Sequence, residues 1–199
     1  MIFFKSRCFR SGWISLSIVL LASACTPRTP LERYYDLARL QMLSRKRNTF
    51  LFLDLRLGMT SADFFQYCRK MNTQGKFING SSNQSVVCTL DTTLKAPVTL
   101  HFFPQFTNNR ITALKATFAY EAFAPWNKAL SSDSLMKDLI TVFANWYGKD
   151  NFIILPRKQQ QEKIIKIDGN RMIIVEMTSA KDVEVTFYDL STEKLPDLT

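Results

Sequence analysis

The stretch "TFLFLDLRLGMTSADFFQYCRKMN", residues 49–72, changes its hydrophobic period from two to nearly four at a single glycine. Before Gly58, apolar and charged residues alternate, which predicts a strand over residues 50–57. After Gly58, Thr60 stands three residues before Asp63, an arrangement typical of a helix N-cap. We therefore expect a strand, a turn and a helix in immediate succession.

The pattern of one helix followed by several short apolar runs occurs twice in the chain. Ser132 or Asp133 is the expected N-cap of the second helix, Gly148 ends it, and Asp168-Gly169 predicts a tight turn further on. Turn-rich pieces such as "PQFTNN" separate the expected strands, which are residues 76–78, 85–90, 98–103, 110–120, 152–155, 163–167, 171–177 and 183–188. We predict an α+β fold of tandem units, residues 49–122 and 123–199, each a helix plus an antiparallel four-stranded meander, with the helices packed on one face of the sheet.

The N-terminal segment has the organisation of an export signal. Three cations precede an uncharged run from Trp13 to Ala24, about a dozen residues long. As a helix this run would rise roughly 18 Å, against ~30 Å for the hydrocarbon core of a bilayer. Residues 1–24 are therefore predicted to be a signal peptide. An ordinary secretory leader or a short uncleaved anchor are the alternatives.

The end of this segment, "LASAC", resembles the lipobox of bacterial lipoproteins. The resemblance implies that Cys25 carries diacylglycerol and becomes the first residue of the mature protein, which would anchor it stably in a membrane. Residues 25–48 would then form the lipid anchor, a stalk and a basic helix. Thr26 does not match the Asp that implies inner-membrane retention in enteric bacteria, so we expect the outer membrane and its periplasmic face.

The mature part is basic. Without the leader, 23 Lys and Arg face 17 Asp and Glu, and much of the excess lies in Arg45 to Arg47 and in residues 156–163. Such clusters could contact anionic lipid headgroups or a negatively charged partner, or they could be solvated surface. Nucleic acid is not an expected partner of an exported protein.

Two cysteines remain after the leader and the lipidated residue. Cys68 and Cys88 form an even pair in a compartment that permits disulfides, so we predict that they bond. The bond would close a loop of about 20 residues and contribute roughly 3 kcal/mol. The alternative is two buried thiols.

A second resemblance concerns "LRLGMTSADFF", Leu55 to Phe65. It resembles the helix-entry motif of small bacterial lipoproteins with the fold of the β-lactamase inhibitor protein. That family implies helices on one face of an antiparallel sheet, and binding to proteins rather than catalysis. The strand expected before Gly58 departs from family members that open with helices.

The sequence carries no recognisable catalytic, metal or cofactor signature. It has one histidine, His101, in an alternating strand, and lacks HExxH, CxxC, GxSxG and glycine-rich phosphate-binding patterns. Asp54, Asp63, Glu176 and Glu184 each stand alone in apolar patterns. We therefore expect neither an enzyme nor a cofactor or metal site.

The aromatic segments "HFFPQF" and "FAYEAFAPW" are the remaining candidates for a binding surface. If exposed they would form a patch that grips another molecule, although they could instead close the core between the units. The candidate residues are Phe102, Phe103, Phe106, Phe123 and Trp126. We expect a non-catalytic protein-binding or assembly module whose partner is another envelope protein. The alternative is a binding protein for a small apolar or glycan ligand held between the two units.

Overall fold

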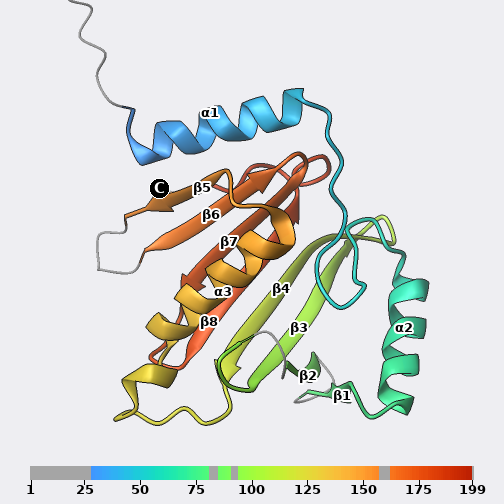
Figure 1. The fold of residues 1–199 in the computed structure, drawn as a ribbon. Helices are drawn as coiled ribbons and strands as arrows, with labels where there is room; N and C mark the ends of the chain where they lie inside the picture. The colour runs from blue at the N-terminus through green and yellow to red at the C-terminus, as the bar shows by residue number, and fades with distance from the viewer. Residues whose placement is uncertain (1–27, 81–84, 91–93, 157–161, 199) are drawn as a thin grey trace, which may run out of the picture.

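The predicted order of a helix and a four-stranded meander, repeated twice, is confirmed in a computed structural model that describes residues 28–80, 85–90, 94–156 and 162–198 (Figure 1). A further helix, α1, precedes them. The elements are α1 (Pro30–Leu43), α2 (Ser61–Thr73), β1 (Ile78–Asn79), β2 (Val86–Leu90), β3 (Val98–Thr107), β4 (Arg110–Tyr120), the short 3-10 helix η2 (Lys128–Leu130), α3 (Ser132–Tyr147), β5 (Phe152–Leu155), β6 (Lys163–Asp168), β7 (Arg171–Met177) and β8 (Asp182–Asp189).

The two meanders join into one antiparallel sheet of order β1-β2-β3-β4-β8-β7-β6-β5. They meet at their last strands, where β4 pairs with β8 from Ala113 opposite Tyr188 to Ala119 opposite Asp182. The hydrogen-bonded ladder is therefore continuous across the boundary between the two units. Any surface formed by β4 and β8 belongs to both of them.

Helices α2 and α3 cover the same face of this sheet, as the sequence predicted. The large core beneath them contains Phe64 of α2, Phe143 of α3 and the inward-facing Phe102, Phe118 and Phe187 of β3, β4 and β8. Thr60 caps α2 as expected, since its Oγ1 accepts the Asp63 N–H at 3.1 Å. The N-cap of α3 is Ser131, one residue earlier than predicted.

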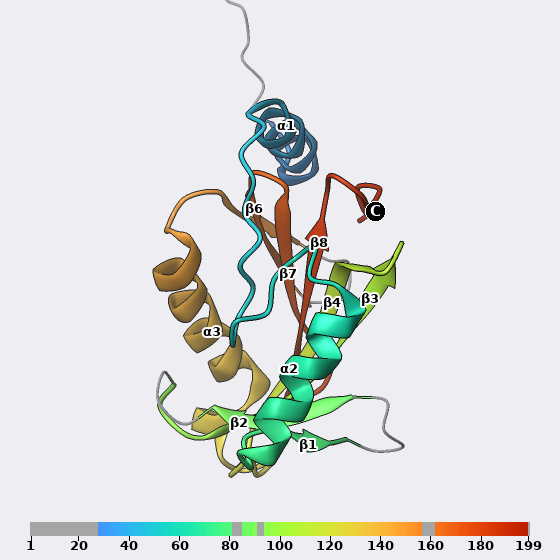
Figure 2. The same cartoon turned by 90° about the vertical axis from the view of Figure 1, so that its right-hand side faces the viewer.

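Helix α1 lies on the opposite face. Along β7, Ile173 and Val175 belong to the core under α2 and α3, whereas Met172 and Ile174 belong to a second core that includes Tyr34 of α1. Alternate residues of a strand point to opposite faces, so the second core is across the sheet from the first. Figure 2 shows α3 on one side of β7 and β8 and the C-terminal segment on the other.

The second core is closed by α1 and the C-terminal segment together. Helix α1 contacts β5 and β6, and its Tyr34 and Ala38 are buried there. The Tyr34 hydroxyl donates a hydrogen bond to the Pro196 carbonyl at 3.0 Å, and Leu195 packs against the same cluster. Strand β7 is consequently buried on both faces from Arg171 to Val175, whereas Ile154 of the edge strand β5 is 54% exposed.

The predicted strand over residues 50–57 is wrong. This segment is a tight loop in which Leu53 and Asp54 have φ of 48° and 62°, and the Leu51 N–H donates to the Leu55 carbonyl at 2.9 Å. The loop runs between α2 and α3 (Figure 1). Its apolar side chains belong to the core that these helices form with the sheet. Its four inserted residues are at most 3% exposed: Leu51, Phe52, Leu55 and Leu57.

Side-chain donors replace the strand partner that this loop lacks. The Tyr147 hydroxyl donates to the Leu51 carbonyl, and the Arg171 guanidinium donates to the Phe50 carbonyl at 2.6 Å. A buried carbonyl without a partner would be costly. The loop is therefore a fixed part of the core.

Two other boundaries differ by four residues or more from the sequence prediction. Strand β3 continues through Pro104 to Thr107, and the turn contracts to Asn108 and Asn109, whose φ of 50° and 61° suit a tight hairpin. Helix α1 ends at Leu43 rather than Asn48. No helix within the described part of the chain has the length and apolarity needed to cross a membrane.

Candidate functional site

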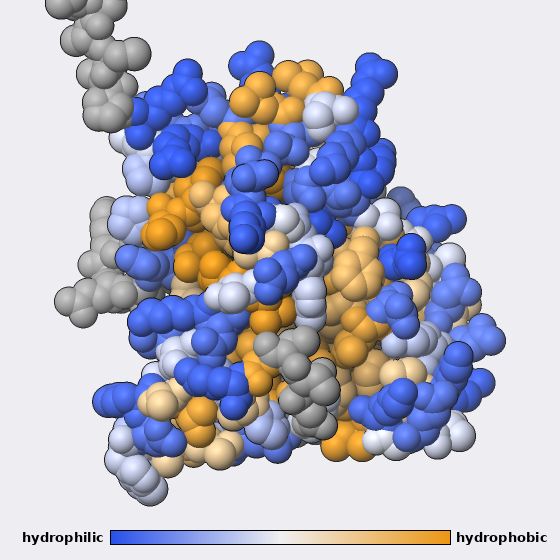
Figure 3. All heavy atoms as spheres, viewed as in Figure 1, coloured by the Kyte–Doolittle hydropathy of each residue, from blue (hydrophilic) through white to orange (hydrophobic). Residues whose placement is uncertain are grey.

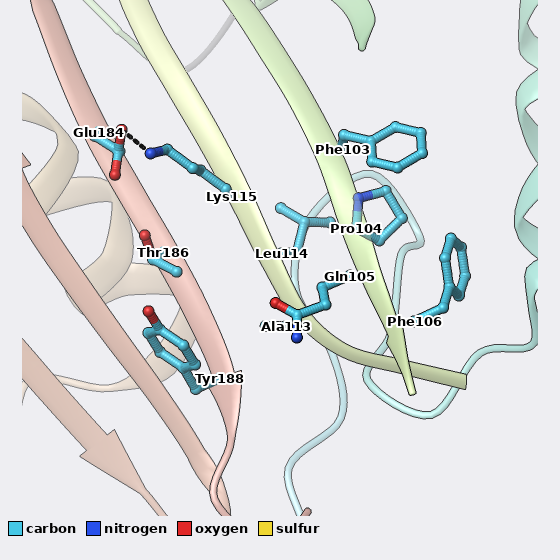
Figure 4. A pocket seen from close by; sticks show the side chains of 10 residues that line it. All are labelled: Phe103, Pro104, Gln105, Phe106, Ala113, Leu114, Lys115, Glu184, Thr186 and Tyr188. Atoms are coloured by element: carbon cyan, nitrogen blue, oxygen red, sulfur yellow. Dashed lines mark ion pairs between the residues drawn. The ribbon is translucent and has the colours of Figure 1, made fainter. Parts of the chain in front are cut away.

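A hollow of about 680 Å³ lies on the sheet face away from α2 and α3, where α1 does not reach. It is bounded by β3, β4 and β8, so both meanders contribute to it (Figure 4). Its volume is within the range of ligand-binding pockets, roughly 300 to 1,000 Å³. We call this hollow the groove.

The floor of the groove is set by a small residue between two larger ones. Ala113 of β4 pairs with Gln105 of β3 on one side and with Tyr188 of β8 on the other. Residues in register on neighbouring strands lie side by side on the same face. Because the Ala113 side chain is only a methyl group, the longer side chains of Gln105 and Tyr188 rise above it as walls.

The β8 wall is polar. The Lys115 ammonium pairs with the Glu184 carboxylate at 2.7 Å, and Glu184 stands opposite Glu176 of β7 in register. Glu176 pairs in turn with Lys163 at 3.2 Å, so the two adjacent carboxylates are compensated from both sides. Burial, followed by the charge of Glu184, raises the pKa of Tyr188. Its phenol therefore stays protonated at neutral pH and can donate a hydrogen bond.

The opposite wall is aromatic. Phe103 and Phe106 lie toward α2 in Figure 4, and Phe106 contacts Phe64 and Phe65 of that helix with ring centroids 5.8 and 6.1 Å apart. Phe65 is 50% exposed and Phe103 is 41% exposed. Large exposed aromatic side chains are common in binding surfaces because they bury much area at little entropic cost.

The aromatic wall occurs where β3 loses its outer neighbour. Strand β2 pairs with β3 only from Val98 to Phe102, so the rest of β3 is a sheet edge. Pro104 has no N–H to offer a further strand, which discourages edge pairing. The phenyl rings of α2 cover this edge instead.

The groove offers side chains that can bind a ligand by hydrogen bonds, charge and stacking. Its lining supplies an ion pair, a neutral phenol, one amide, one hydroxyl and two phenyl rings. His101 lies on the same face of β3, opposite Thr117, and is exposed. Among the described residues, no three His, Cys, Asp or Glu side chains gather closely enough to hold a metal ion.

The structure does not bring the five predicted aromatic residues into one patch. Phe102 is 1% exposed and belongs to the core, while Phe103 points to the other face because neighbouring residues alternate. Phe103 and Phe106 line the groove. Phe123 and Trp126 follow the far end of β4, and Trp126 is 85% exposed.

Cys68 and Cys88 are free thiols in the structure, and the disulfide stays a prediction. Cys68 lies on α2 and Cys88 on β2, and each lines a hollow next to Phe77. Burial raises the pKa of Cys68 to about 11 and that of Cys88 to about 12. Both are therefore protonated at neutral pH and react slowly. Cys25 lies outside the described residues.

Sequence reasoning missed the polar wall and Phe65. The alternation "VEVTFY" in β8 places Glu184, Thr186 and Tyr188 on one face, which is a usable signal. Their meeting with Lys115 depends on the pairing of β4 with β8, which sequence pattern alone does not specify. No protein-family model, curated protein or solved structure matches this chain.

Proposed function

We propose that the protein is a lipid-anchored cell-envelope module without catalytic activity that binds a partner protein through the groove. The observation that carries this proposal is the uneven cover of one sheet face. Helix α1 and the C-terminal segment close the second core, whereas the groove is left open with an aromatic wall and a polar wall. An open surface of this composition is typical of protein recognition.

The anchor in this proposal depends on the lipobox resemblance at Cys25. The variant Cys25→Ser should lose lipid labelling and be released from membranes, because the thiol is the attachment atom. Palmitate labelling of cells followed by fractionation measures both effects. Cys68→Ser is the matched control and should leave labelling unchanged. Membrane retention of the Cys25→Ser variant without lipid would contradict the anchor.

The groove can be tested separately by site-directed photo-crosslinking. A photoreactive amino acid at Phe103 should capture one envelope protein in a defined band, since this side chain is 41% exposed in the aromatic wall. Adding Thr186→Arg places a large cation in the opposite wall and should remove the band. Asn145→Arg adds the same charge on an exposed position of α3, on the other face, and should preserve it. A band that survives Thr186→Arg would contradict binding through the groove.

A small ligand is the second candidate, and one observation favours it. The groove crosses the boundary between the two units, and Tyr188 and Phe103 could stack against an apolar ligand or a sugar ring. Native mass spectrometry of the protein purified from its own envelope distinguishes the two candidates. A small molecule that is lost in the Thr186→Arg variant would support the ligand, and a protein complex would support the partner.

A further inference from the structure

The C-terminal end of α1 exposes apolar side chains that no other described element covers. Leu40 is 63% exposed and Leu43 is 69% exposed. In a helix these positions lie beside Arg39 and away from Tyr34 and Ala38, which face β5 and β6. Figure 3 shows apolar side chains flanked by hydrophilic ones along the top of the molecule, over α1.

Cations surround these leucines. Between residues 28 and 47 there are six Arg or Lys and two carboxylates, and both carboxylates lie in the first half of the helix. Asp36 pairs with Arg28 at 3.0 Å, and Glu32 accepts the Thr29 N–H in a capping box. All charged residues in the second half of the helix and in the loop after it are therefore basic. We call Arg39, Leu40, Leu43, Arg45 and Arg47 the basic end of α1.

The loop that carries two of these cations is held in one conformation. The Asn170 N–H donates to the Lys46 carbonyl at 3.2 Å, and the Gly169 N–H donates to Gln41 Oε1 at 2.8 Å. The contact is close enough that a Cβ built on Gly169 would lie 2.3 Å from the Lys46 carbonyl oxygen. The backbone that carries Arg45 and Arg47 is therefore fixed against the turn between β6 and β7.

Not all cations of the loop are neutralised by the protein. Lys46 pairs with Asp168 at 2.9 Å. Arg45 and Arg47 form no ion pair with any described residue, and the Arg47 guanidinium donates to the Ser191 hydroxyl. Both line a hollow of about 400 Å³ beside Asn170. A phosphate group could enter this hollow and meet both guanidinium groups.

We propose that the basic end of α1 docks on the surface of an anionic phospholipid bilayer. Its leucines enter the headgroup region and its arginines bind lipid phosphates. Interfacial helices commonly bury apolar side chains and pair basic side chains with anionic lipids in this way. The inference rests in part on the proposed anchor. Four residues lie between Cys25 and Pro30, and the five Cα–Cα steps that join these two residues span at most about 18 Å even when fully extended. A lipid on Cys25 would therefore hold α1 close to the membrane.

Vesicle binding tests this proposal without using the lipid. The chain from Thr26 onward keeps every described residue, and both cores are built from residues 31–198. It should sediment with vesicles of phosphatidylglycerol and phosphatidylcholine, but not with pure phosphatidylcholine, and added salt should weaken the binding. The double variant Arg45→Gln, Arg47→Gln should bind about 30-fold more weakly, and Leu40→Ser, Leu43→Ser about tenfold.

The matched control removes two cations elsewhere. Arg69 and Lys70 are exposed on α2, which lies well away from α1 (Figure 1). Arg69→Gln, Lys70→Gln should change vesicle binding by no more than about twofold. Thermal unfolding checks that each variant is folded, which is expected because all substituted positions are exposed.

Three results would overturn the proposal. The first is equal binding to charged and neutral vesicles. The second is an equal loss of binding in the α1 and α2 charge variants, which would indicate net charge alone. The third is absence of vesicle binding, which would leave an acidic protein as the partner of this surface. None of these results bears on lipid labelling of Cys25, so failure of the anchor and failure of the docking surface are distinguishable.

Discussion

The sheet face opposite α2 and α3, which we call the outer face, has two halves. Helix α1 and the C-terminal segment cover one half, and the groove occupies the open half. The neighbouring strands β7 and β8 differ in hydrophobic pattern where these halves meet. In β7 the residues Met172 to Val175 are all apolar and buried, because both faces of this strand are covered. In β8 the buried Val183, Val185 and Phe187 alternate with the half-buried Glu184, Thr186 and Tyr188. The change from a continuous to an alternating pattern occurs at the point where the cover by α1 and the C-terminal segment ends.

The difference shows which half depends on its neighbours for stability. The side chains of the covered half would expose a large apolar area if α1 left. The open half presents an ion pair, a hydroxyl and a phenol, all of which can face water. The fold should therefore be stable with the groove empty, which is what transient binding of the proposed partner requires.

The largest expected effect concerns the covered half. Tyr34→Ala removes a fully buried ring and its hydrogen bond to Pro196, so the free energy of unfolding should fall by about 3 to 5 kcal/mol. Thr186→Ala in the open half should change it by no more than about 0.5 kcal/mol. Urea unfolding followed by circular dichroism measures both. Similar small effects in the two variants would mean that α1 does not stabilise the sheet.

The border of the covered half can be tested at Gly169, against which the loop after α1 packs. An alanine there would have a φ of +61° and a Cβ 2.3 Å from the Lys46 carbonyl oxygen. Gly169→Ala should therefore lower the free energy of unfolding by about 2 to 4 kcal/mol. Gly75 also has positive φ, at +69°, but nothing lies within 4 Å of its Cβ position. Gly75→Ala should cost only about 1 kcal/mol, and equal costs would show that the contact is absent.

How far the sequence predicts this molecule depends on the range of the interactions involved. The helices and hairpins follow from local signals such as the Thr60 cap and the Asp168-Gly169 pair, which lies at the turn between β6 and β7. The alternation over residues 50–57 misled because the inserted loop, like a strand, buries Leu55 and Leu57 and exposes the charged residues beside them. It also buries the adjacent residues Leu51 and Phe52, which a strand with one buried face would not do. Asp54 is a residue type that tolerates positive φ, but the positive φ of Leu53 before it has no sequence signal of the kind that Gly, Asn or Asp provides.

The groove was harder to predict than the fold for the same reason. Phe103 was a candidate because it lies in an aromatic run, but its partners in the groove come from other strands. Tyr188 and Gln105 lie on either side of Ala113, and this arrangement depends on the register of β4 with β3 and with β8. Local patterns identify which face a residue occupies, whereas long-range pairing decides what stands beside it.

The stability of the protein at alkaline pH tests whether Cys88 is buried in the core beneath α2. Burial raises the pKa of Cys88 from its ordinary value of 9.0 to about 12. As the pH rises above about 9 the unfolded chain loses this proton first, so this thiol alone should lower the free energy of unfolding by up to about 1.4 kcal/mol per pH unit until pH 12 is approached. Urea unfolding under reducing conditions measures this slope.

The variant Cys88→Ala provides the control for this slope. It lacks the buried thiol, so its alkaline loss of stability should be shallower than that of the unsubstituted protein. The same comparison without reductant tests the predicted disulfide, because a bonded pair does not titrate. Mass spectrometry of the unreduced protein then checks the bond directly. Identical slopes with reductant would contradict the burial of Cys88.

The smallest expected effect concerns the polar wall of the open half. Lys115→Met removes the partner of Glu184, whose side chain is 18% exposed and stands opposite Glu176. Because the Lys115 side chain is 64% exposed and screened by water, the loss should be only about 0.5 to 1 kcal/mol, and it should shrink as salt is added. Lys137→Met breaks a more exposed pair with Asp133 on α3 and should cost about 0.3 kcal/mol. A loss above about 2 kcal/mol for Lys115→Met would mean that Glu184 requires its lysine for folding, so that the open half is as dependent on its neighbours as the covered half.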